Sequence, residues 1–260
     1  MKEGLEYQSF EIFLEYPEHL TIRARFPQTP LQFCRRQMAG ALRSFGYNAQ
    51  GALGLGDTTD RATPEQVGSS DWDAIAAGYA HALGIRDDGT LWSWGANGSG
   101  QGGHGDTTDR YAPVQIGVST WLSVAAGIQH SLAVKSDGTR WSWGYADYNQ
   151  TGHGDTTQRD SPTQIGAGAT WALVFAGGSH SLAVKSDGTL WAWGRNDFGQ
   201  LGLGDTTQRS APVQVGADTW IAASSNSVSN THSLGIKSDG TLWAWGLGSN
   251  GRLGLGSTTQ

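Results

Sequence analysis

Histidine side chains that recur at a regular spacing are the groups best suited to chemistry in this chain. Four of them repeat about every 50 residues and could surround a metal ion. They are His81, His130, His180 and His232. Two more, His104 and His153, stand where other copies of the repeat have leucine, but two imidazoles without further ligands make a poor metal site. We therefore predict no metal site.

Aspartates in four Gly-Asp-Thr-Thr segments superficially suggest calcium binding. They are Asp57, Asp106, Asp155 and Asp205. Calcium takes about six to eight oxygen ligands, whereas a single aspartate before two threonines more simply caps a turn with its side chain. The glycine-rich runs do not open a helix, as a phosphate-binding loop must, and no nucleophile elbow or HExxH motif is present. We expect neither catalytic residues nor a cofactor.

The composition and charge exclude several classes of protein. The chain has 260 residues, with 39 Gly, 12 Trp and a net charge of -6. Residues 42–260 carry 12 Lys and Arg against 18 Asp and Glu, so the basic patch that nucleic-acid binding requires is not expected. No apolar run is long enough to span a membrane, and the glutamate-rich start does not resemble a secretory signal. We expect a soluble protein without nucleic-acid or membrane partners.

Internal repeats show which elements must position these side chains. Tetrapeptides of the form Trp-x-Trp-Gly begin at Trp92, Trp141, Trp191 and Trp243, at spacings of 49, 50 and 52 residues. The histidines, the Gly-Asp segments and a proline follow the same period, which is the mark of a repeat architecture. The predicted units are 69–117, 118–166, 167–216 and 217–260, after a half unit at 42–68. Residues 1–41 do not match, and we expect at most a hairpin about Pro17 there.

Each unit predicts four short strands. The segment from Trp121 to Gly127 forms the first, and the segment from His130 to Gly144 forms a hairpin about Asp137-Gly138. Asp-Gly favours a two-residue turn with positive φ at both central residues. A Pro-Val-Gln segment adds a fourth strand, and no helical periodicity appears in residues 42–260. Four strands in about 50 residues predict one propeller blade per unit and an all-β fold.

The pattern AAGxxHSLAVKSDGTLWxWGxNxxGQLGLGDTTxRxxPVQxG, which covers residues 42–260, resembles the repeat of the regulator of chromosome condensation family in its bacterial style. The resemblance implies a β-propeller of four-stranded antiparallel blades, which usually closes with seven. The chain holds only about 4.5 units, so we expect an incomplete or open arc with apolar ends that favour self-association. The resemblance also implies that each repeated histidine locks the inner loop of its blade by a hydrogen bond.

The tryptophans recur in every full unit, three apiece, which favours packing over a local binding site. Burying one removes about 200 Å² from water, worth more than stacking one exposed base or sugar. We assign a structural role to the repeated histidines and to the paired tryptophans. The pairs are Trp92 and Trp94, Trp141 and Trp143, Trp191 and Trp193, and Trp243 and Trp245.

Variation between the repeats indicates where binding resides. The loop tips after each Trp-x-Trp-Gly differ in aromatic and charged residues, and the last unit carries an insertion before its histidine. Variable loops on a rigid scaffold are the usual place for recognition. The candidate partner-binding residues are Tyr145, Asp147, Tyr148, Arg195, Asp197, Phe198, Asn226 and Asn230.

The family resemblance implies a non-enzymatic scaffold that binds a protein through these loops, since family members bind partners as different as a small GTPase, chromatin and a β-lactamase. Guanine nucleotide exchange on a small GTPase is an alternative, although the wedge hairpin that the family uses for it has no counterpart among the short insertions here. A carbohydrate-binding or adhesin-like surface module is a third interpretation, which the aromatic tips allow.

Overall fold

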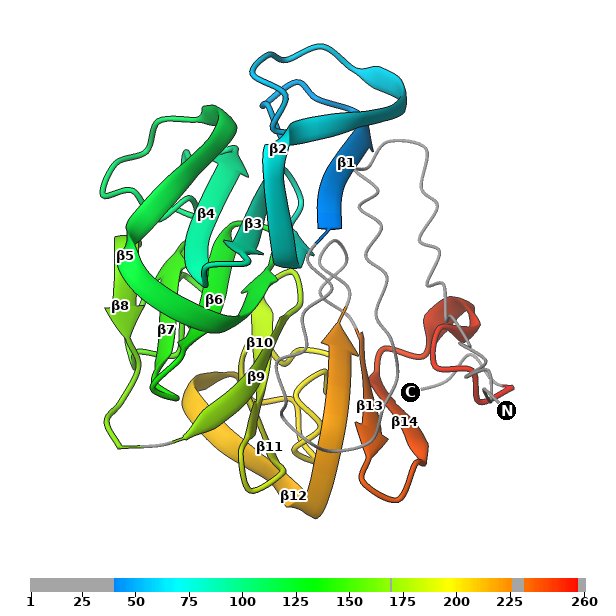
Figure 1. The fold of residues 1–260 in the computed structure, drawn as a ribbon. Coiled ribbons are helices and arrows are strands. Elements are labelled where there is room, and N and C mark those ends of the chain that lie inside the picture. Colours follow the sequence, from blue (N-terminus) through cyan, green and yellow to red (C-terminus); the bar gives the residue numbers. More distant parts are fainter. Residues whose placement is uncertain (1–39, 169, 226–231, 257–260) are drawn as a thin grey trace, which may run out of the picture.

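The computed structural model describes residues 40–168, 170–225 and 232–256 (Figure 1). Asn226, Asn230 and the hairpin expected about Pro17 lie outside these ranges. The described residues form 14 β-strands and a single 3-10 helix, η1 (Ser249–Gly251). The predicted all-β fold class is therefore confirmed.

The strands form five successive antiparallel groups, which we call blades 1 to 5. Blade 1 contains β1 (Gly40–Gly46) and the first half of β2 (Arg61–Ala77). Blade 2 contains the second half of β2, β3 (His81–Arg86), β4 (Thr90–Gly95) and the first half of β5 (Arg110–Ala126). Blade 3 contains the second half of β5, β6 (His130–Lys135), β7 (Arg140–Gly144) and β8 (Arg159–Gln164).

Blade 4 contains β9 (Trp171–Ala176), β10 (His180–Lys185), β11 (Thr189–Gly194) and the first half of β12 (Arg209–Ser225). Blade 5 contains the second half of β12, β13 (His232–Lys237) and β14 (Leu242–Gly246). Blades 2, 3 and 4 thus have four strands, whereas the described parts of blades 1 and 5 have two and three. Figure 1 shows the blades following one another along a curved arc from β1 to β14, which is the incomplete propeller that the repeat count predicts.

Three junctions between blades are continuous strands, although the repeat pattern predicts separate ones. β2, β5 and β12 are each 17 residues long and serve two neighbouring blades. In β5, Thr120 pairs with Thr90 while Gln115 pairs with Trp92, so a bulge around Gly117 (φ 58°) turns the strand into the next blade. The junction between β8 and β9 has one more residue than the others, and there the strand is interrupted.

The hairpin turns differ from the predicted geometry. The amide of Gly138 donates to the carbonyl oxygen of Lys135 at 2.9 Å, and Gly138 has φ 81°, whereas Asp137 is not among the residues with positive φ. The loop is therefore a three-residue turn with one left-handed glycine, and the expected pair of positive φ angles was wrong. The Asp137 carboxylate accepts hydrogen bonds from the amide and hydroxyl of Thr139, which favours this longer loop.

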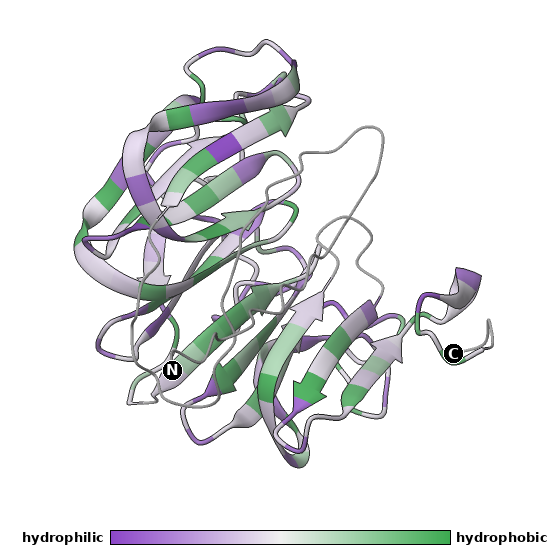
Figure 2. Ribbon diagram, turned by 45° about the vertical axis from the view of Figure 1, so that its right-hand side comes forward, coloured by the Kyte–Doolittle hydropathy of each residue, from purple (hydrophilic) through white to green (hydrophobic). Residues whose placement is uncertain are grey.

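Hydrophobic side chains pack between neighbouring blades, in addition to within each one. Leu91 and Ile116 of blade 2 pack with Trp121 and Trp143 of blade 3 in a single buried cluster. Figure 2 shows hydrophobic and hydrophilic residues alternating along the strands, as expected when the two faces of a blade meet different surroundings. Each blade is therefore stabilised by the blade that follows it, and the last described blade lacks that cover.

Candidate interaction face

The repeated histidines join one blade to the next. The Nε2 atom of His81 lies 3.0 Å from the Oγ of Ser131, whose hydroxyl donates to the carbonyl oxygen of Gln101. Because that hydroxyl uses its proton on the carbonyl, Nε2 of the histidine must be the donor to the serine. His130 with Ser181, and His180 with Ser233, repeat this arrangement at 3.0 and 2.9 Å.

Burial keeps these histidines neutral. It lowers the pKa of His81 to about 4, and the pKa values of His130 and His180 to about 3. His232 is half-buried, and its pKa is lowered by burial and by Arg252. The described residues hold no group of three or more histidine, cysteine or acidic side chains that could bind a metal ion. The ring bonds of His81, His130 and His180 run to the following blade, and their Nδ1 atoms have no hydrogen-bond partner among the described residues. The expected side-chain hydrogen bond to the inner loop of the same blade was therefore wrong for these three.

The second tryptophan of each pair reaches into the preceding blade. The indole N–H of Trp143 donates to the carbonyl oxygen of Gln101 at 2.8 Å, and that of Trp193 to the carbonyl oxygen of Gln150 at 2.8 Å. Both side chains are fully buried. Trp94 and Trp245 make the corresponding bonds to Ala52 and Gln200.

The first tryptophan of each pair stays within its own blade. Trp141 meets Trp121 edge to face, with ring centroids 6.1 Å apart, and its indole N–H donates to Thr139. Lys135 lies 3.7 Å above its ring centroid, which is a cation–π geometry. The same stack recurs on the other first tryptophans. It pairs Trp92 with Arg86, Trp191 with Lys185 and Trp243 with Lys237.

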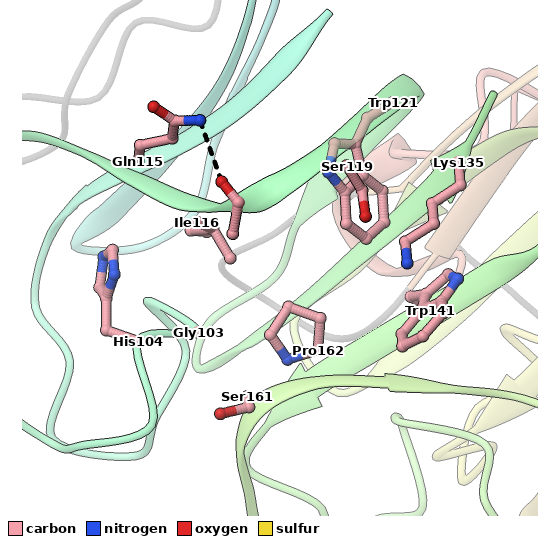
Figure 3. Close-up of a pocket in the computed structure, with 11 residues that line it drawn as sticks. Gly103, His104, Gln115, Ile116, Ser119, Trp121, Lys135, Trp141, Ser161 and Pro162 are labelled. Carbon is pink, nitrogen blue, oxygen red and sulfur yellow. Dashed lines mark hydrogen bonds between the residues drawn. The ribbon is translucent and has the colours of Figure 1, made fainter.

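The pocket between blades 2 and 3 is built from such repeated parts. It has a volume of about 360 Å³ and is lined by His104, Gln115, Ser161, Lys135 and Trp141, among others (Figure 3). Figure 3 shows Lys135 directed toward the two tryptophans and the Gln115 amide directed to the backbone of Gly117. Its cation and its aromatic rings are already paired with each other.

His104 and His153 each belong to a local polar pair. The Nε2 atom of His153 lies 2.9 Å from the Oγ of Ser142, and burial lowers the pKa of His153 to about 4. Ser93 and His104 form the same pair at 2.8 Å. In blade 4 the corresponding positions are Ala192 and Leu203. In blades 2 to 5 serine occurs only with histidine and alanine only with leucine, a signal that the sequence reasoning missed, whereas blade 1 combines Ser44 with Leu55.

Arg140 is a second residue that the sequence reasoning missed. It stands where blades 2 and 4 have Leu91 and Leu190, and only 3% of it is exposed. Its guanidinium lies 3.9 Å from the ring centroid of Trp171 and 4.6 Å from that of Trp193. Nε and Nη1 have no hydrogen-bond partner among the described residues, and burial lowers the pKa of Arg140 to about 9. The Thr-Arg-Trp segment, in place of Thr-Leu-Trp, marks it in the sequence.

Five of the predicted partner-binding residues come together across blades 3 and 4. Tyr145 donates to Asp147 at 2.5 Å, which raises the pKa of Tyr145, and Arg195 pairs with Asp197 at 2.6 Å. The Arg195 guanidinium lies 4.9 Å from the ring centroid of Tyr148 in the neighbouring blade. We call these five residues the tip cluster.

The remaining predicted residues are placed differently. At the base of its loop, the amide of the half-buried Phe198 donates to the side chain of Gln200 at 2.9 Å, the same bond that the amide of Tyr148 makes to Gln150 at 3.0 Å. The two residues differ in exposure, since the side chain of Tyr148 is exposed. The Asn196 side chain holds that base by bonds to Asp205, Thr207 and Leu201. Asn226 and Asn230 fall in the undescribed range 226–231.

Backbone hydrogen bonds place the tips beside the loops that precede the histidines. Tyr145 N donates to Gln129 O, and Arg195 N donates to Ser179 O, at 2.8 and 2.9 Å. Tyr79 lies in the corresponding loop of blade 2 and is 48% exposed, and Tyr47 occupies the repeat position of Tyr145 and is 54% exposed. These two tyrosines extend the candidate face, and their exposure could not be inferred from one repeat alone.

Comparisons with known proteins agree with this architecture. A family model described as an RCC1-like domain matches residues 33–260, which confirms the resemblance indicated by the repeat motif. A search of curated proteins found no relative that matches. No helix in the described ranges is long and apolar enough to cross a membrane.

Several solved structures share the fold. Human WBSCR16 aligns with a TM-score of 0.73 and 21% identity, over 86% of this chain and 61% of that chain. Yeast RCC1 (Prp20) bound to Kap60 aligns with a TM-score of 0.73 and 21% identity, over 85% and 55%. Prp20p from Saccharomyces cerevisiae aligns with a TM-score of 0.73 and 20% identity, over 92% and 59%. This chain therefore spans less than two thirds of the length of each neighbour, and the likeness establishes the propeller fold.

Proposed function

This chain belongs to the RCC1-like domain family, and from that premise we propose that it is a non-enzymatic scaffold that binds a protein partner through the loops of one face. The binding surface consists of the tip cluster with Tyr47 and Tyr79. These side chains project from loops whose bases are held by backbone and asparagine hydrogen bonds. Aromatic side chains on a rigid base lose little conformational entropy on binding, which suits protein recognition.

The contact between Arg195 and Tyr148 carries this proposal. It joins the variable loops of two blades into one continuous surface, with the Arg195 guanidinium 4.9 Å from the Tyr148 ring centroid. The two carboxylates of the cluster are each held by an arginine or a tyrosine. Arginine and tyrosine are enriched among the residues that dominate binding energy at protein interfaces.

The structural neighbours support a protein as the partner class. One neighbour is yeast RCC1 bound to Kap60, and another was studied for its binding to Gsp1p and histones. The net charge of -6 of this chain disfavours a direct nucleic-acid partner. A protein with basic and aromatic side chains would complement the tip cluster best.

The proposal is tested by quantitative affinity capture with the triple variant Y145A/Y148A/R195A. The matched control is V118A/L122A/I221A, which trims exposed apolar side chains on the bulged strands β5 and β12. We expect the tip variant to lose a specific partner that wild type and control both retain, with the thermal midpoint unchanged in all three.

Two other results would overturn the proposal. If the tip variant unfolds at a much lower temperature, the tip cluster is part of the folded core instead of a binding surface. If the wild-type protein accelerates nucleotide release from purified small GTPases, or binds a glycan array through the tip cluster, the scaffold assignment is wrong and one of the two alternatives holds.

A further inference from the structure

The outer edge and face of β14 are uncovered among the described residues. Leu242 is 69% exposed, whereas the corresponding Leu91 and Leu190 are both fully buried. On the neighbouring strand, Ile236 is 36% exposed, whereas Ile85 is 2% exposed. The difference arises because blade 5 has neither a fourth strand nor a following blade within the described ranges. An open strand edge beside an apolar face is a template for the addition of another strand.

The complete blades show what chemistry fits this edge. In blade 2 the fourth strand places Arg110 opposite Gly95 and Gln115 opposite Trp92. Blade 3 pairs Arg159 and Gln164 with Gly144 and Trp141, and blade 4 pairs Arg209 and Gln214 with Gly194 and Trp191. The residue after the glutamine is buried in each case: Ile116, Ile165 and Val215. By the same register, a fourth strand beside β14 would place an arginine opposite Gly246 and a glutamine opposite Trp243.

One segment of this chain has that pattern and already serves as the neighbour of β1. Residues 61–67 (Arg-Ala-Thr-Pro-Glu-Gln-Val) pair only with β1, in a two-stranded half blade whose other edge has no strand among the described residues. Val67 is 1% exposed there and packs with Leu42 and Trp72 in one buried cluster. Gln66 faces Arg43 there, whereas its equivalents in blades 2 to 4 face a tryptophan. Moving to β14 would give Gln66 a tryptophan partner, Trp243.

We propose that residues 61–67 of one copy of this chain add to β14 of a second copy as its fourth strand, so that the chains associate head to tail. Trp72 follows that segment as Trp121 follows the fourth strand of blade 2. Trp121 packs with Leu91 and Ile85 in one buried cluster, so Trp72 of the incoming copy exchanges its buried contact with Leu42 for the same contact with Leu242 and Ile236. The new interface copies the contact between blades 2 and 3, and the two surfaces that meet are different, as in any head-to-tail assembly.

Disulfide trapping tests the proposed register. In blade 4, Val213 faces Ala192, which places Glu65 of the incoming strand opposite Ala244. The variant C34S/E65C/A244C is expected to form disulfide-linked oligomers in mild oxidant, beyond any formed by the control C34S/E65C. A disulfide between the two new cysteines of a single chain would overturn the proposal, because the chain would then close on itself. The absence of any such disulfide would overturn it as well.

A second disulfide trap holds residues 61–67 on β1 of their own chain. Glu65 faces Ser44 in β1, so the oxidised variant C34S/S44C/E65C fixes residues 61–67 on β1. Light scattering is expected to show a molar mass that grows with concentration for C34S, and the mass of a single chain for the oxidised trap, with association restored by reductant. Association that is unchanged in the oxidised trap would overturn the proposal.

The variant C34S/L242K gives an independent check that does not depend on disulfide chemistry. Leu242 is mostly exposed, so a lysine there leaves the single chain folded. We expect the thermal midpoint at low concentration to match C34S while association is lost, because a buried lysine at the new interface has no partner. If C34S/L242K associates as C34S does, or if C34S itself is a single chain at every concentration, the proposal fails.

Discussion

The Nε2 atom of His130 in blade 3 lies 3.0 Å from the Oγ of Ser181 in blade 4, and that hydroxyl donates to the carbonyl oxygen of Gln150 back in blade 3. Trp193 donates to the same carbonyl. One serine therefore links two blades twice, at a place where every group is fully or almost fully buried. The arrangement recurs at the junction between blades 2 and 3 through His81 and Ser131.

Ser181→Ala is expected to lower the free energy of unfolding by about 1–3 kcal/mol, because the buried His130 N–H then has no acceptor. Ser186→Ala is the matched control: Ser186 is exposed and bonds only to Thr170, so a change within about 0.5 kcal/mol is expected. Urea unfolding of both variants and wild type measures the difference. Equal losses in the two variants would show that the inter-blade bond adds nothing.

Stability is expected to fall as the pH drops below neutral. His81, His130 and His180 have folded-state pKa values of about 4, 3 and 3, below the ordinary value of 6.5. Between about pH 6.5 and pH 4 the unfolded chain binds protons that the folded chain excludes, so unfolding becomes more favourable as the pH falls. Each histidine contributes at most about 1.4 kcal/mol per pH unit.

The variant His130→Gln checks this assignment, because glutamine can keep a donor toward Ser181 but does not titrate. Urea unfolding at several pH values between 7.5 and 4.5 should give a shallower loss of stability for the variant than for wild type. A slope equal to that of wild type would assign the acid sensitivity to other groups.

Arg140→Leu is expected to raise the free energy of unfolding by about 1–4 kcal/mol, because a leucine fills the same site at Leu91 and Leu190 without burying a charge. Chemical denaturation measures the gain. The comparison variant Arg140→Ala removes the charge but leaves a cavity beside Trp171 and Trp193. Its free energy of unfolding should therefore be lower than that of Arg140→Leu. If Arg140→Leu is less stable than wild type, the stacking of the guanidinium on Trp171 and Trp193 stabilises the fold by more than the burial of its charge costs.

Ser142 and His153 are expected to be energetically coupled. Ser142→Ala alone leaves the half-buried His153 without its partner at 2.9 Å, whereas the double variant S142A/H153L reproduces the Ala192 and Leu203 pair of blade 4. A double-mutant cycle by urea unfolding should give a coupling energy of about 0.5–1.5 kcal/mol. Additive effects of the two single changes would contradict the pairing.

Particular residues show which features of the fold the repeat pattern predicted and which it did not. The Trp-x-Trp-Gly tetrapeptides and the Asp-Gly turns place the two hairpin strands of blades 2 to 4, because hairpin pairing depends on local spacing. The turn type was predicted wrongly, since it depends on how Asp137 bonds to Thr139. The continuous strands β2, β5 and β12 could not be told from separate ones, because the bulge at each glycine is set by pairing on both sides.

For the candidate face, variation between repeats identified Tyr145, Tyr148 and Arg195 as neighbours on successive loops. It did not reveal that Arg195 stacks on Tyr148, or that Phe198 is half-buried whereas Tyr148, at the same repeat position, is exposed. Repeat position cannot show which side chain points outward when two loops of different blades meet.

The sequence by itself determined the all-β class, the length of the repeat, the incomplete arc and the residues that recur in each blade, because all of these follow from periodicity along the chain. Only the tertiary structure decided that His130 bonds to Ser181, that Arg140 is buried against Trp171, and that Leu242 is uncovered. These three facts depend on contacts between residues in different blades. Such contacts arise from how one blade packs on the next, which no single repeat contains.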